Sequence, residues 1–253
     1  MARRLSQAAL AARAAISPRH LSFVENGRAN PSRDVVLVLC DALDVPLRER
    51  NELLAAAGFA TGFTASTLAA DTHRQLRRAL DHVLAQQEPF GAIIVDARWN
   101  LVEANRGATR MLAQFPPRSA AGLEAARNLV LATLHPDALR GYVVNWDEVA
   151  GAVMTRLHHE VAATPHDEAR ARLLATALAT PGVPTSWRAR PPGRTADPFL
   201  TVHLRSETLD VRVFSMITTI GTPLDVTVEE LRIESFFPAD AASEHALRAL
   251  AAT

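Results

Sequence analysis

The hydrophobic positions of the first sixty residues recur at the three- and four-residue spacing of short amphipathic helices. Ser6 and Ser17 each precede such a stretch and can cap a helix, and Pro18 occupies a first helical position, where a missing N–H costs nothing. Gly27 permits the left-handed backbone that ends a helix. The pattern therefore predicts four short helices, over about residues 7–14, 17–25, 32–43 and 47–57.

In the remainder of the chain, the spacing of hydrophobic positions is helical in some stretches and alternates as in strands in others. A polar helix is predicted over about 72–87, and loops over 113–122 and 181–198. Further helices are predicted over 106–112, 146–164, 166–179 and 240–251, and strands over 89–95, 99–104, 199–204, 209–220 and 226–237. In the last strand, Leu231 and Ile233 alternate with Arg232 and Glu234, which predicts an antiparallel sheet with one covered face.

These patterns predict an N-terminal all-α helix-turn-helix bundle followed by an α+β domain with an antiparallel sheet. We expect the helix-turn-helix domain in residues 1–62, a linker and connecting helix in 63–88, and the second domain in 89–253. A short helix, a three-residue turn and a second short helix form the arrangement that reads the major groove of DNA.

Positive charge is concentrated at the predicted helix-turn-helix. Glu25 is the only acid among residues 1–33, which also hold six arginines and so carry a net charge of +5. Because the whole chain is neutral, residues 34–253 carry −5. This asymmetry indicates an N-terminal unit that binds nucleic acid. The six arginines are Arg3, Arg4, Arg13, Arg19, Arg28 and Arg33.

Several classes of chemistry have no support in the sequence. Cys40 is the single cysteine, in an apolar run, so we expect a core residue and neither a disulfide nor a cysteine-based metal site. Glycine-rich nucleotide loops, a nucleophile elbow and an HExxH helix are absent, and His158 and His159 are adjacent and cannot share a helix face. We expect no enzyme, no metal and no cofactor, and, without an apolar stretch of about 18 residues, a cytoplasmic protein with no membrane partner.

Four stretches of the N-terminal unit have a familiar spacing: Ser6–Ala11, Ile16-Ser17, Val24–Arg28 and Asn30–Ser32. Together they resemble the phage-repressor-like (Cro-type, or XRE) helix-turn-helix over about residues 5–45. That family has a further helix before the Ser6 position. Only five residues precede Ser6 here, so the first helix is expected to be missing.

The resemblance implies the residues that contact DNA. It assigns Gln7 to the phosphate backbone or an outer base. Arg19 can bind a guanine through two hydrogen bonds, whereas Arg28 and Arg33 are expected to contact phosphates. The implied reading helix holds Ser17, Pro18, Arg19, His20, Ser22 and Phe23.

The second domain begins with a strand, a turn at Asp96, a second strand and a helix that Asn105 can cap. This order is similar to that of PAS-type sensors. The stretches Ala126–Val130 and Asn145–Ala150, together with the strands, resemble the ligand-binding domain of MmyB-like transcription regulators. This resemblance implies a PAS-like sensor, with fatty-acid-like ligands for some members. Candidate ligand contacts are Trp99, Asn105, Trp146, His203, Arg205 and Phe214.

The sequence therefore predicts a transcriptional regulator that binds double-stranded operator DNA as a homodimer and senses a small apolar or fatty-acid-like effector. Two alternatives stay open. One is a cofactor-bearing PAS-type sensor or enzyme. The other is a protein-interaction module whose N-terminal helices dock a partner without contacting DNA.

Overall fold

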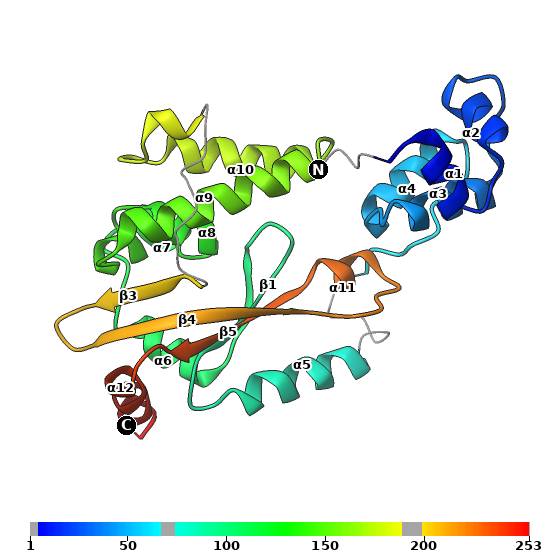
Figure 1. Ribbon diagram of the computed structural model, residues 1–253. Helices are drawn as coiled ribbons and strands as arrows, with labels where there is room; N and C mark the ends of the chain where they lie inside the picture. The colour runs from blue at the N-terminus through cyan, green and yellow to red at the C-terminus, as the bar shows by residue number, and fades with distance from the viewer. Residues whose placement is uncertain (1–4, 67–73, 189–198, 253) are drawn as a thin grey trace. The chain divides into compact units, whose positions relative to one another are not determined.

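Contacts within the computed structural model, which describes residues 5–66, 74–188 and 199–252, divide the chain into two units (Figure 1). One comprises Met1–Asp71 with Ile220–Glu230, and the other comprises Thr72–Thr219 with Leu231–Thr253. A segment between two strands of the second unit thus belongs with the N-terminal helices. The predicted domain boundaries are continuous ranges, and they stay predictions.

The first unit is a bundle of short helices, and serine side chains cap the starts of three of them. The hydroxyls of Ser6, Ser17 and Ser32 each accept a hydrogen bond from the backbone N–H three residues ahead, at 3.2, 3.1 and 3.3 Å. The four helices predicted from the sequence are confirmed within one residue at each end. The helices of this unit are α1 (Gln7–Arg13), α2 (Pro18–Glu25), α3 (Arg33–Ala42), α4 (Leu47–Ala56) and α11 (Val226–Glu230).

The core of the first unit is small. Val36, Cys40 and Leu54 form one buried cluster in it, so the expectation of a core cysteine is confirmed. Burial raises the pKa of the Cys40 thiol. Ala15 makes the turn between α1 and α2 with a φ of 53°, in the left-handed region.

The second unit is built on one five-stranded antiparallel sheet with the order β2-β1-β5-β4-β3. The predicted α+β domain with an antiparallel sheet is therefore confirmed. All four β1 residues are buried, so both faces are covered there. The strands are β1 (Ala92–Val95), β2 (Leu101–Ala104), β3 (Thr201–Arg205), β4 (Asp210–Thr219) and β5 (Arg232–Pro238).

Helices lie on both sides of this sheet, and Figure 1 shows α8, α9 and α10 on one side and α5 on the other. The helix α12 packs against β4 and α6. The helical segments of the second unit are α5 (Arg74–Gln86), α6 (Arg106–Ala113), α7 (Ala120–Ala125), α8 (Leu129–Leu134), η2 (Leu139–Tyr142), α9 (Trp146–Ala163), α10 (Glu168–Ala179), η3 (Thr185–Arg188) and α12 (Ala241–Ala251).

Three sequence-based assignments are wrong in part. The strand predicted over 226–237 begins as the helix α11, because Asp225 caps Thr227 and Val228 and overrides their β propensity. The loop predicted over 113–122 already contains the start of α7, where Gly122 packs directly against the backbone of Asp137. Part of the loop predicted over 181–198 forms η3, and residues 189–198 lie outside the described residues.

Candidate functional site

The first candidate site is the exposed start of α2. Ser17, Pro18 and Arg19 are exposed, and Leu21 on the opposite side is 1% exposed and holds the helix against the bundle. His20 donates its backbone N–H to the Ser17 hydroxyl, so the first turn is ordered. A helix anchored on one face can present its N-terminal side chains to a groove of DNA.

The Arg19 side chain lies along the surface of α2. Its guanidinium carbon is 5.3 Å from the centre of the Phe23 ring, one helical turn away. The described part of the chain offers no carboxylate as an ion-pair partner to Arg19 or Arg28. Two positive charges near α2 are therefore available to an external anion.

The other predicted DNA contacts surround this helix. Gln7 at the start of α1 donates its amide to the carboxylate of Glu25 at the end of α2, at 2.5 Å. Ser22 and Phe23 are partly buried on α2. Arg28 is exposed just after the helix, and the Arg33 guanidinium approaches Gly62. The predicted DNA contacts thus gather on one helical unit, and their roles stay predictions.

The segment Ile220–Glu230 completes the first unit through its contacts with α4. The Glu229 carboxylate accepts the backbone N–H of Leu47 at 2.7 Å, and Glu230 forms a two-bond ion pair with Arg48 at 2.6 and 2.9 Å. Burial raises the pKa of Glu229. Charged groups at the helix start therefore hold the segment in place.

Asp225 is the second anchor of this segment. One carboxylate oxygen accepts hydrogen bonds from Thr64 and Ser66, and the other caps α11. Burial alone raises the pKa of Asp225, but the hydrogen bonds from Thr64 and Ser66 outweigh it and hold the pKa below its usual value.

The second candidate site is a cavity of about 480 Å³ within the second unit, between the sheet and the helices α6, α8 and α9. This volume is in the range of pockets that hold small organic molecules. Its walls are predominantly apolar, with contributions from Ile93, Trp99, Met111, Val130, Val149, Val153, Val213 and Phe236.

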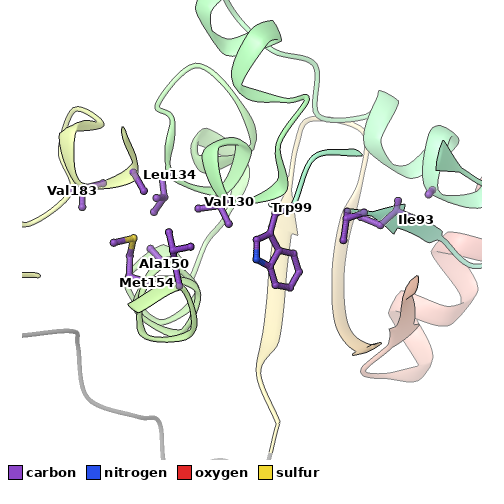
Figure 2. Close-up of a cluster of buried hydrophobic side chains, with 11 residues drawn as sticks. Ile93, Trp99, Val130, Leu134, Ala150, Met154 and Val183 are labelled. Atoms are coloured by element: carbon purple, nitrogen blue, oxygen red, sulfur yellow. The ribbon is translucent and has the colours of Figure 1, made fainter. Parts of the chain in front are cut away.

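Trp99 forms part of the cavity wall beside a charged cluster. Figure 2 shows its ring between Ile93 of β1 and Val130 of α8. The guanidinium carbons of Arg156 and Arg232 lie 4.4 and 4.7 Å from the Trp99 ring centre. Both arginines pair with Glu160, at 3.3 and 3.0 Å, and the Trp99 indole donates to the same carboxylate. The cluster therefore fixes the ring in place.

Four polar side chains also line the cavity: Thr133, Arg156, Ser215 and Glu234. Glu234 in β5 is 9% exposed, and its Oε2 has no hydrogen-bond partner among the described residues. Burial raises the pKa of Glu234, while the Ser215 hydroxyl and the Arg156 charge act in the opposite direction. The sequence placed Glu234 on an uncovered strand face, and this expectation is wrong because α9 covers that face.

The structure places the six predicted ligand contacts differently. Trp99 lines the cavity. The other five lie outside its wall: Asn105 caps α6 and binds the backbone of Leu84 and Phe90, Trp146 donates to the Thr133 carbonyl, His203 and Arg205 both bind Asp210, and Phe214 packs between Phe199 and Phe237. Their ligand roles stay predictions.

The described residues lack the features of two other classes of site. Among them, no group of three or more His, Cys, Asp or Glu side chains could hold a metal ion. Of the helices within those residues, none is long and apolar enough to cross a membrane.

The fold and these two sites define a DNA-binding transcription regulator with a ligand-binding domain. Residues 1–53 match a helix-turn-helix domain family. Residues 76–250 match the family of the MmyB-like transcription regulator ligand binding domain, and the chain belongs to this family. A comparison with curated proteins finds no match. The resemblances noted from the sequence are therefore confirmed.

Proposed function

We propose that the chain is a one-component regulator that binds a double-stranded DNA operator as a homodimer and responds to an apolar, fatty-acid-like effector. The observation that carries the DNA-binding part is the exposed start of α2, where Arg19 lies on a helix fixed by buried Leu21. One such helix covers a half-site, so two copies suit a palindromic operator. The proposal assigns no reaction to the chain and places its action in the cytoplasm.

Arg19 and Arg28 have different proposed roles. Arg19 reads a guanine through the two-pronged face of its guanidinium, which lysine cannot reproduce. Arg28 neutralises a phosphate, for which any positive charge suffices.

The test is fluorescence anisotropy with DNA from the chain's own upstream region, at several salt concentrations. We expect Arg19→Lys to weaken specific binding by about 10- to 100-fold, with little effect on binding to random DNA. Arg28→Lys, the matched control, should change both by less than about 3-fold. If Arg19→Lys and Arg28→Lys are indistinguishable, α2 does not read bases.

The effector part of the proposal is supported by the cavity of about 480 Å³ and its apolar wall. Two strands that line it, β4 through Ile217 and β5 through Phe236, are joined by the segment 220–230. That segment packs on α4 through Glu229 and Glu230. We propose that an effector that spreads or tightens β4 and β5 thereby shifts this segment and biases the placement of the reading helix.

A further inference from the structure

Glu234 places a carboxylate where the sheet forms the floor of the cavity. It lies opposite Ile93 of β1 on one side and Ile217 of β4 on the other, and both of these apolar side chains line the same cavity. The residue is 9% exposed, and its Oε2 has no hydrogen-bond partner among the described residues. A buried carboxylate oxygen without a partner is costly, which favours a ligand that supplies the missing bond.

The charge of Arg156 acts on Glu234, but this guanidinium is held beside another carboxylate. Arg156 lines the cavity, but its guanidinium stacks on Trp99 and pairs with Glu160 at 3.3 Å. Ser215, in the neighbouring strand, offers only one hydroxyl proton. A ligand in the cavity can supply the missing bond to Oε2. Burial raises the pKa of Glu234, and a donor on the ligand acts in the opposite direction by stabilising the ionised carboxylate, which only accepts.

We propose that the cavity takes an aliphatic molecule that carries a hydroxyl or ammonium group, and that this group donates a hydrogen bond to Oε2 of Glu234. The inference rests on the proposed function and refines it: the fatty-acid-like chain fills the apolar wall, while the polar group is a donor in place of a carboxylate. A fatty carboxylate could take this position only by sharing a proton with Glu234, because two ionised carboxylates repel each other in a poorly solvated site.

The test compares dodecyl probes that differ in one group. The intrinsic fluorescence of the full chain reports binding to the second unit, because all three tryptophans, Trp99, Trp146 and Trp187, lie in it. We expect 1-dodecanol to bind at least about 10-fold tighter than dodecyl methyl ether, which lacks the donor, and tighter than dodecanoate. Dodecylamine, titrated in parallel, distinguishes an ammonium donor from a hydroxyl.

Glu234→Gln and Glu103→Gln form a matched pair of variants. Glu103 lies on the exposed strand β2, away from the cavity wall. Gln at position 234 can donate to the ether oxygen, so the preference for dodecanol should fall to within about 2-fold, whereas Glu103→Gln should keep it. Glu234→Met removes every hydrogen-bonding group from this side chain and should bind dodecanol and the ether equally. This second variant keeps the test valid if the glutamine side chain takes a different orientation from the glutamate.

The outcomes separate this inference from the proposed function. Binding of the probes without a preference for donors, or tighter binding of dodecanoate, overturns the role of Glu234 and leaves the apolar sensor intact. Failure of every dodecyl probe to bind overturns the effector proposal, and this inference with it. A donor preference that vanishes only in the position-234 variants supports both.

Discussion

The two units present their functional residues in opposite ways. In the first, a small core around Val36, Cys40 and Leu54 supports an outward-facing helix whose candidate contacts are exposed. In the second, a larger core surrounds an internal cavity. Glu234, a carboxylate in the predominantly apolar wall of this cavity, is buried. The reading surface depends on neighbours in sequence, whereas the cavity depends on residues brought together from eight helices and strands.

If the units are separable, the largest effect should come from Leu54→Ala, which truncates a fully buried side chain of the small core. We expect a loss of about 2–5 kcal/mol, enough to unfold a marginal helical unit. DNA binding should be lost, while dodecanol titrations followed by tryptophan fluorescence stay unchanged. Leu53→Ala, at a neighbouring exposed position, is the control. A parallel loss of dodecanol binding would show that the units fold as one.

A smaller effect is expected from Asp225→Ala, which removes the acceptor shared by Thr64 and Ser66 and the cap of α11. Loss of these charge-assisted bonds should cost about 2 kcal/mol. We expect DNA and dodecanol each to bind nearly as in the parent chain, but dodecanol should no longer change DNA affinity. Anisotropy titrations with and without dodecanol measure this coupling.

Asp240→Ala is the matched control for Asp225→Ala, because Asp240 caps α12 in the second unit by accepting from Ser243. It should lower stability to a similar extent and leave the effect of dodecanol on DNA binding in place. Retained coupling in Asp225→Ala would mean that segment 220–230 does not transmit the effector signal.

The same contrast explains what the sequence could predict. Ser6, Ser17 and Pro18 act within one turn of their own helices, so their spacing was enough to locate α1 and α2. The antiparallel sheet followed from alternation along single strands. The helix α11 was missed because the β-branched residues after Asp225 favour a strand, and the bonds that hold the Asp225 carboxylate come from Thr64 and Ser66, about 160 residues away in the chain.

Glu234 shows the same limit at the candidate site. Its alternation with Ile233 is typical of a solvated strand face, and only the packing of α9 over the sheet buries it. The one signal available was a carboxylate in a strand that also holds Phe236 and Phe237, and this signal does not separate a cavity from an exposed face.

The turn between α1 and α2 offers a gain in stability. Ala15 has a φ of 53°, a conformation that costs an L-residue about 1 kcal/mol and glycine almost nothing. Ala15→Gly should therefore raise the stability of the first unit by up to about 1 kcal/mol, read as an increase in Tm by circular dichroism, without changing DNA affinity. Ala12→Gly, inside α1, should lower stability by about the same amount. If both variants lower the stability of the first unit equally, the backbone at Ala15 is not strained.

The smallest change in stability is expected from Asp210→Asn, on the strand face that carries His203 and Arg205. Hydrogen bonds from His203, and then from Arg205, hold the pKa of Asp210 below its usual value. A depressed pKa stabilises the fold above the unfolded pKa of about 3.9, and this stabilisation is lost as the pH falls through the lower, folded value.

The Tm of the parent chain should therefore exceed that of Asp210→Asn slightly at pH 6, and the two should converge as the pH falls below the folded pKa of Asp210. Because His203 and Arg205 contact Asp210 and lie outside the cavity wall, releasing them should leave dodecanol binding unchanged. A marked loss of dodecanol binding in Asp210→Asn would instead place His203 and Arg205 in the effector site, and the contrast between an exposed reading surface and a buried cavity would no longer hold.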